Sequence, residues 1–237
     1  MRAVIIAGAF ETPTRRINSH EWFTNPFVYV ENLAMANTSS RYQQLGRRVL
    51  DCGLAEGIVV PDMGTIAGLG AQPVYKSFEK IYADAEAAIL AKIQSDGGQQ
   101  AYLIGHSLGG NIATIAAHKY PHLVAGVVSI GTPHDGIDAT TDLLYTHLND
   151  ALRNATAEVG RRRAMLDTAA PWLATIASNR DDTVSVASAM PAMADYHLPF
   201  SHHNNLHHVD MMHDKAIVEF CGQVVAGTRF SNLPHAA

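Results

Sequence analysis

The chain has 237 residues, of which 47% are hydrophobic and 16% charged, and its 17 Lys and Arg against 22 Asp and Glu give a formal net charge of −5. This length is enough to bury a sizeable core without disulfides or metal sites, and the composition excludes a disordered chain, a collagen and a coiled coil. The mild negative charge argues against a nucleic-acid partner, and the low charged fraction indicates large buried faces.

Short apolar runs rich in Val and Ile recur along the chain, and each is followed by a longer segment. The six runs are Ala3 to Ala7, Gly57 to Pro61, Ala101 to Gly105, Leu123 to Ile130, Trp172 to Ser178 and Asp195 to Leu198. Unbroken apolar runs are typical of strands that are covered on both faces. The alternation therefore predicts one α/β domain over residues 1–237, with a parallel sheet of about six strands flanked by helices.

Helical periodicity predicts several helices between these runs. Three of them cover Ser40 to Leu50, Leu108 to Tyr120 and Met212 to Val225. A fourth follows from apolar residues spaced three and four apart: Val74, Phe78, Ile81, Tyr82, Ala85, Ile89 and Ile93.

Two segments do not fit the alternation of strand and helix. Residues Glu11 to Thr38 form a long loop, and Asp138 to Asp167 is predicted to form one or two amphipathic helices. Loops of such length are usually functional or contain structure of their own. We therefore expect 11–38 and 138–167 to be pocket walls or a lid, and the alternative is ordinary surface decoration.

No export or membrane segment is visible in the sequence. The apolar run Ala3 to Ala7 is too short for a signal peptide, and no apolar run approaches the roughly 18 residues that span a bilayer. A cytoplasmic protein without an integral membrane segment is expected, and the alternative is secretion after removal of a leader.

The motif with the clearest chemistry is Gly105-His106-Ser107-Leu108-Gly109-Gly110, which follows a predicted strand and begins a predicted helix. A nucleophilic serine on a sharp strand-to-helix turn needs small neighbours, because side chains at Gly105 or Gly109 would collide with the adjoining elements. Ser107 would then lie at the positive end of the helix, which favours an oxyanion. The alternative is a plain tight turn that needs small residues.

Together with Gly131-Thr132-Pro133-His134 after the next strand, this motif makes the chain resemble the α/β-hydrolase family, specifically its bacterial lipases and esterases. The resemblance covers nearly the whole length and begins at what corresponds to the family's third strand. It implies a reduced α/β-hydrolase fold, in which a histidine activates the serine and an acid orients the histidine. The order along the chain is serine, acid, histidine, and no cofactor is implied.

The acid implied by this resemblance lies in the turn after Trp172 to Ser178. The family pattern, an Asp with Val three positions later, matches Asp181 and Val184. Asp182 is the alternative, because an Asp followed by Thr-Val also occurs in such turns. The other Asp would then be an ordinary turn or capping residue.

The histidine implied by the resemblance lies after the last strand, where five are available: His202, His203, His207, His208 and His213. His208 matches the family pattern, because a pair of bulky apolar residues, Met211-Met212, follows at the expected distance. A metal site with His208 and His213 as ligands is a second hypothesis, but no Cys pair or His-Glu-x-x-His motif accompanies them. The expected metal set is therefore none.

The oxyanion hole of such enzymes uses two backbone N–H groups. One would be that of Leu108, the residue after the nucleophile. The other would be that of Ala9, which takes the last position of the family's His-Gly-x triplet, here Ala7-Gly8-Ala9. Because Ala7 replaces the usual His, Phe10 is an alternative donor.

These residues predict a serine hydrolase that cleaves carboxylic esters through an acyl-enzyme, with Ser107 as nucleophile, His208 as base and Asp181 as the orienting acid. The expected partner is a small-molecule ester or a lipid-like substrate, and the sequence predicts no oligomeric state. An acyltransferase or thioesterase with the same triad is the alternative, an amide hydrolase is less favoured, and a non-catalytic binding protein on the same scaffold is a further hypothesis.

Overall fold

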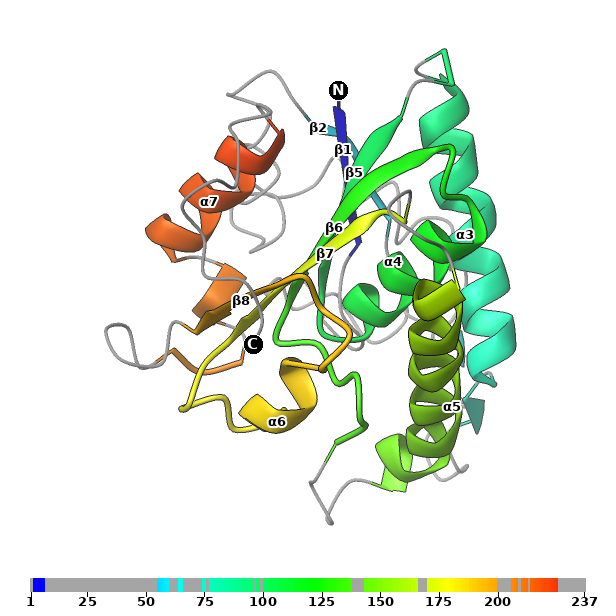
Figure 1. Cartoon of the computed structure of the whole chain (residues 1–237). Helices are drawn as coiled ribbons and strands as arrows, with labels where there is room; N and C mark the ends of the chain where they lie inside the picture. Colours follow the sequence, from blue (N-terminus) through cyan, green and yellow to red (C-terminus); the bar gives the residue numbers. More distant parts are fainter. Residues whose placement is uncertain are drawn as a thin grey trace, which may run out of the picture.

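A sheet of six parallel strands forms the centre of the described part of the chain (Figure 1). The computed structural model describes residues 2–6, 55–59, 64–65, 74–75, 77–95, 97–98, 100–137, 143–165, 170–199, 206–208, 210–212 and 214–225. The strands are β1 (Arg2–Ile6), β2 (Ala55–Val59), β5 (Ala101–His106), β6 (Val124–Ile130), β7 (Trp172–Ala177) and β8 (Tyr196–Pro199). The six apolar runs therefore predicted the sheet, with small shifts at the strand ends.

The order of the strands creates a place where a site can form. In the sheet the order is β2-β1-β5-β6-β7-β8, so the chain first builds outward from β1 and then returns to the other side of β1 with β5. In open α/β sheets, ligands bind outside the carboxyl ends of the strands at such a reversal. Ser107 directly follows β5, so the predicted nucleophile lies at this position.

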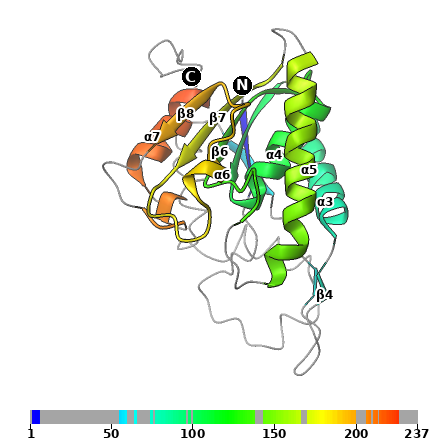
Figure 2. The same ribbon diagram turned by 60° about the horizontal axis from the view of Figure 1, so that its bottom comes forward.

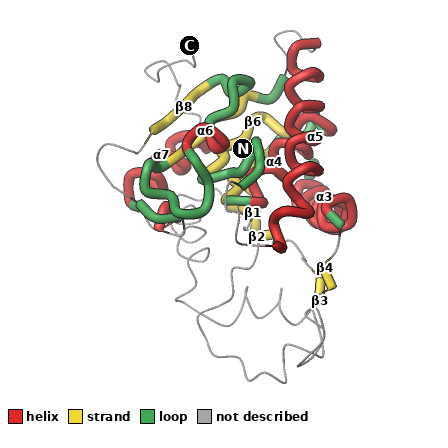
Figure 3. Tube along the Cα trace, turned by 90° about the horizontal axis from the view of Figure 1, so that it is seen from below, coloured by secondary structure: helices red, strands yellow, loops and turns green. Residues whose placement is uncertain are grey.

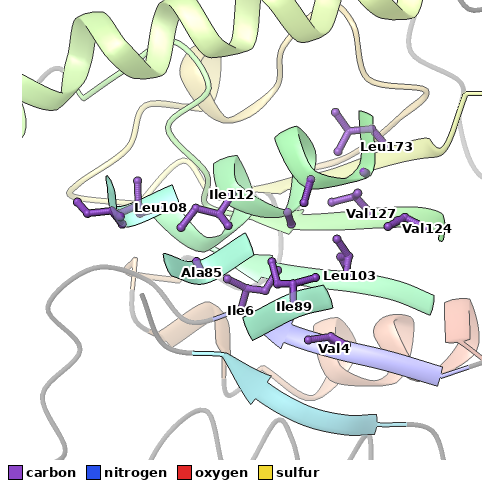
Figure 4. Close-up of a cluster of buried hydrophobic side chains, with 14 of the residues drawn as sticks. Val4, Ile6, Ala85, Ile89, Leu103, Leu108, Ile112, Val124, Val127 and Leu173 are labelled. Atoms are coloured by element: carbon purple, nitrogen blue, oxygen red, sulfur yellow. The ribbon is translucent and has the colours of Figure 1, made fainter. Parts of the chain in front are cut away.

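Helices cover both faces of the sheet, as the unbroken apolar strands predicted. In Figures 1 and 2, α3 (Phe78–Ser95), α4 (Leu108–Lys119) and α5 (Leu143–Met165) lie on one face, and α7 (Lys215–Val225) lies on the other. Successive side chains of a strand point to opposite faces, so Leu103 packs toward α3 and α4 while Ile104 packs in the cluster that contains α7. Figure 4 shows side chains of the first cluster pointing toward one another.

The helix α3 confirms the predicted apolar face, with one correction. Its buried residues recur three and four apart: Phe78, Ile81, Ala85, Ile89 and Ile93. Val74, however, does not belong to this helix, because it pairs with Thr65 in a short antiparallel ladder of β3 (Gly64–Thr65) and β4 (Val74–Tyr75). The helix begins only after Ser77, whose carbonyl oxygen accepts hydrogen bonds from the N–H groups of Lys80 and Ile81.

The predicted segment 138–167 contains one described helix, α5. Its Leu148 and Leu152 side chains are buried in the cluster that includes α4, so this part of the segment covers the sheet. Residues 138–142 and 166–167, the loop 11–38 and the predicted helix over 40–50 lie outside the described residues. The role of 11–38 and 138–167 as pocket walls or a lid therefore stays a prediction.

The last helix begins later than the pattern predicted. Instead of starting at Met212, the chain forms a 3-10 turn over Asp210–Met212, and α7 starts at Lys215. The Asp214 carboxylate determines this start, because its Oδ1 accepts hydrogen bonds from the N–H groups of Ala216 and Ile217 at 2.9 and 3.1 Å. The helix α6 (Val186–Ala189) was not predicted. No described helix is both long and apolar enough to span a bilayer.

Candidate active site

The predicted site residues that the structure describes gather at one end of the sheet. In Figure 1, β1 runs downward from the N-terminus, so the carboxyl ends of the parallel strands face the side from which Figure 3 is seen. Ser107 follows β5, Gly131 follows β6, Asp181 lies in the turn after β7, and His208 follows β8. The topology therefore brings residues that are far apart in sequence to the same edge.

Ser107 lies on a strained turn between β5 and α4. It has φ 53° and ψ −131°, and it is the one non-glycine residue with positive φ among those described. A Cβ at Gly105 would lie 2.4 Å from the Gly109 carbonyl oxygen, so no larger residue fits there. Such a conformation costs about 1–3 kcal/mol and clusters at functional sites. The local geometry is a strained strand-to-helix turn, as the predicted nucleophile elbow requires.

Asp181 and His208 form a buried pair. The Nδ1 atom of His208 lies 2.8 Å from Oδ2 of Asp181, and their side chains are 10% and 1% exposed. The other carboxylate oxygen, Oδ1, accepts hydrogen bonds from the N–H groups of Thr183 and Val184, both at 2.8 Å. Because both oxygens are engaged, the carboxylate has one orientation, with Oδ2 toward the imidazole.

Asp182 lies on the other side of the same turn, and its carboxylate does not bind the His208 ring. Its side chain is 66% exposed and lies 3.6 Å from Nδ1 of His207, while Oδ1 is 3.5 Å from the backbone N of His208. Partial burial tends to raise the pKa of Asp182, but hydrogen bonds from backbone N–H groups, including that of His208, outweigh burial and lower this pKa. Of the two candidate acids, the structure pairs Asp181 with the histidine.

Gly131 connects the pair to the elbow. The backbone N–H of Ser107 donates a hydrogen bond to the Ile130 carbonyl oxygen at 2.9 Å, which fixes Ser107 next to the end of β6. Gly131 has φ 51°, and a Cβ there would lie 3.1 Å from Oδ2 of Asp181 and 3.3 Å from Cε1 of His208. Glycine is favoured here, because φ 51° strains other residues and because a Cβ would also lie 2.5 Å from Cε of Met211 and press on the pair.

A buried polar layer supports the segment that contains Gly131. Nε2 of His134 lies 3.1 Å from Oγ of Ser129, and the Asn111 side-chain amide donates to the Pro133 carbonyl oxygen at 3.1 Å. The His134 side chain is almost fully buried, and burial lowers its pKa to about 3. In the sequence, His134 stands out only as the last residue of Gly131-Thr132-Pro133-His134, and this motif is the signal that could have indicated the support.

His134 makes the fold sensitive to acid. Below pH 6.5 the unfolded chain binds a proton at this residue that the folded chain does not bind until about pH 3, so stability falls as the pH falls. We expect a loss of about 2 kcal/mol from this group between pH 7 and pH 5. Denaturant unfolding at both pH values should therefore show a smaller loss in His134→Gln than in wild type. The exposed His207→Gln variant should behave like wild type, and an unchanged loss in His134→Gln would contradict this account.

Several predicted site residues lie outside the described part of the chain, namely Ala9, Phe10, His202, His203 and His213. The described candidate for the oxyanion hole is Leu108, the buried first residue of α4, so its backbone N–H lies at the N-terminus of that helix. Within the described ranges, no group of three or more His, Cys, Asp and Glu is placed to hold a metal ion.

Comparisons with known proteins agree with this fold. The chain is similar to the lipolytic enzymes LipS and LipT from a metagenome, with a TM-score of 0.56, 14% identity and coverage of 95% of this chain and 93% of that chain. It is also similar to serine hydrolase CCSP0084 from Cycloclasticus zankles, with a TM-score of 0.55, 11% identity and coverage of 98% and 91%. The product of gene lin2722 from Listeria innocua gives a TM-score of 0.57 at 11% identity, with coverage of 98% and 96%.

Sequence comparison identifies the family. No curated protein matches the chain. The family model described as alpha/beta hydrolase fold matches residues 61–189, more than half of the chain, and this range includes the elbow at Ser107 and the turn at Asp181. With the parallel sheet, the strained serine and the buried acid and histidine at one edge, this match shows that the chain belongs to the α/β-hydrolase family.

Proposed function

We propose that the protein hydrolyses carboxylic esters, with Ser107 as nucleophile, His208 as general base and Asp181 as the acid that orients it. The observation that carries this proposal is the buried contact of 2.8 Å between His208 Nδ1 and Asp181 Oδ2, at the sheet edge where Ser107 has φ 53°. A serine hydroxyl is a weak nucleophile, and a base held by a third group is the arrangement that activates it.

The pairing with Asp181 determines which nitrogen of His208 acts on the serine. A carboxylate accepts hydrogen bonds, so Nδ1 carries a proton and Nε2 is left as the basic nitrogen. In the proposed reaction, Nε2 takes the proton of the Ser107 hydroxyl while Oγ attacks the acyl carbon. The proton then passes to the leaving alcohol, and an acyl-enzyme remains. Water, deprotonated by Nε2, attacks the acyl carbon, and the acid is released as Ser107 regains its proton.

The negative oxygen of each tetrahedral intermediate needs preorganised donors. The Leu108 N–H is proposed as one donor, because it lies at the N-terminus of α4, where backbone N–H groups and the helix dipole favour negative charge. The Ala9 N–H is proposed as the second donor, and this part of the proposal rests on the family resemblance alone.

The test uses two measurements on the wild-type protein. A fluorophosphonate should label the folded chain at one peptide, and mass spectrometry should place the label on Ser107. Nitrophenyl esters of two to sixteen acyl carbons should be hydrolysed with an optimum that separates an esterase from a lipase. Heat-denatured protein is the control, because free serines are not activated. The absence of both label and hydrolysis would overturn the proposal in favour of a binding protein.

Product analysis distinguishes hydrolysis from acyl transfer by the same triad. With an ester substrate in water, a hydrolase yields the free acid at the rate at which the alcohol is released. An acyltransferase would release free acid slowly and would transfer the acyl group to an added alcohol. Faster cleavage of a thioester than of the matching oxygen ester would favour a thioesterase.

A further inference from the structure

His106, the residue before the proposed nucleophile, contacts His208 in two ways. Its Nε2 atom lies 3.0 Å from the backbone carbonyl oxygen of His208, and the centroids of the two rings are 4.6 Å apart at an angle of 39°. The His106 side chain is 1% exposed. Because a carbonyl oxygen only accepts hydrogen bonds, Nε2 of His106 carries the proton and donates it.

This hydrogen bond is stronger than the contact that the described part of the chain shows at the backbone N–H of His208. The distance of 3.0 Å is ordinary for a nitrogen–oxygen hydrogen bond, and the bond is buried. The contact of the Asp182 carboxylate with the His208 N–H is 3.5 Å long, and that side chain is 66% exposed, so water competes with it. Asp181 orients the ring of His208, and among the described residues His106 holds its main chain more firmly than Asp182 does.

Because His106 directly precedes Ser107 in the chain, this hydrogen bond also relates the position of His208 to that of Ser107. His106 and Ser107 are covalent neighbours, and the Ser107 backbone is fixed by its hydrogen bond to the Ile130 carbonyl oxygen. One short, rigid segment at the end of β5 therefore carries the serine and also holds the backbone of the histidine. Any shift of the segment that contains His208 relative to Ser107 must break or stretch the bond from His106.

We infer that His106 is a positioning residue, which sets the distance between Ser107 and His208 by tethering the main chain of the base to the strand that carries the nucleophile. The inference rests on the proposed function. A misplacement of about 1 Å in such a site can lower the rate about 100-fold, because proton transfer needs a close approach of donor and acceptor. Because the His106 side chain is 1% exposed, we expect it not to contact substrate, and substrate binding should change little.

Three variants separate the effect of this hydrogen bond from that of simple packing. In His106→Phe a buried ring remains but the donor is lost, and we expect kcat to fall about 10- to 100-fold with KM within about twofold of wild type. In His106→Gln the amide nitrogen reaches about as far as Nε2 of histidine, and we expect most of kcat to return. His106→Asn is one carbon shorter and should behave like Phe, so the pair of Gln and Asn tests the tether even where Phe does not fold.

The matched control is His118→Phe. His118 is also a buried histidine, but it lies near the opposite end of α4, where Nδ1 is 2.8 Å from the Thr114 carbonyl oxygen. The kcat of the His118→Phe variant should stay near that of wild type. Equal loss of kcat in His106→Phe and His118→Phe would overturn the inference. Failure of His106→Gln to recover activity would overturn it as well. A wild-type kcat in both His106→Phe and His106→Asn would also contradict it.

A second readout does not depend on turnover. The Nδ1 proton of His208, observed by NMR, should exchange faster with water in His106→Phe than in wild type, and His106→Gln should restore its protection. Absence of ester hydrolysis and of fluorophosphonate labelling in wild type would contradict the proposed function, whereas this exchange still tests the tether. Unchanged exchange in His106→Phe and His106→Asn would overturn the inference while leaving the proposed function in place.

Discussion

Ser107→Ala is expected to lower kcat/KM for the best nitrophenyl ester by about 10⁴-fold or more, because no other group can form the acyl-enzyme. A small residual rate should remain from the oxyanion donors and from substrate binding. Alanine and serine both have a Cβ, so alanine tolerates φ 53° at position 107 as well as serine does, and the fold should be kept. The measurement is steady-state hydrolysis together with fluorophosphonate labelling, and labelling should disappear.

Ser188→Ala is the matched control for this variant. Ser188 is a buried serine at the carboxyl end of the sheet, and its hydroxyl donates a hydrogen bond to the Gly136 carbonyl oxygen at 2.6 Å. Loss of the Ser188 hydroxyl should lower the free energy of unfolding by about 1–3 kcal/mol, because the Gly136 carbonyl is left without this donor. Activity of the folded Ser188→Ala protein should remain near that of wild type. Equal rates in Ser107→Ala and wild type would contradict a serine mechanism.

The sheet and the strained turn of the predicted elbow could be predicted from sequence because each depends on local requirements. A strand that is buried on both faces is apolar at most positions, and β5 has all six residues buried, with His106 at its end as the polar exception. The elbow needs glycine where a Cβ would collide with backbone, and Gly105 is such a position. In both cases the sequence contains the steric requirement itself.

Long-range contacts could not be predicted in the same way. The bond from His106 to the His208 carbonyl joins residues 102 positions apart, and nothing near His106 in sequence indicates it. The start of α7 was placed too early, because apolar periodicity takes no account of a capping side chain such as Asp214. Val74 was assigned to a helix because a short strand before the helix continued its spacing by chance.

The choice between Asp181 and Asp182 also depended on three-dimensional geometry. Neighbouring residues in a turn point in different directions, and the family pattern allowed both. The N–H groups of Thr183 and Val184 favour Asp181, since both donate to its Oδ1 and so direct Oδ2 toward His208. These donors are backbone N–H groups, which almost every residue has. The residue types in the sequence therefore do not indicate which N–H groups will bind the carboxylate.

Asp181→Asn is expected to lower kcat about 10⁴-fold, whereas Asp182→Asn should change it by less than about threefold. In Asp181→Asn the amide oxygen can still accept the hydrogen bonds from Thr183 and Val184, so the turn should be kept. The amide nitrogen then replaces the oxygen that faces Nδ1 of His208. Two donors cannot pair, so the imidazole is driven to the tautomer that carries its proton on Nε2, which cannot accept the serine proton.

Asp182→Asn is the matched control for this substitution, because the same change is made one residue away on an exposed side chain. Steady-state kinetics and thermal unfolding of the two variants should show similar stability and very different kcat. The Nδ1 proton resonance of His208 should be lost in Asp181→Asn and kept in Asp182→Asn, since only the first removes its acceptor. A larger loss of kcat in Asp182→Asn would mean that the acid of the triad had been assigned to the wrong side of the turn.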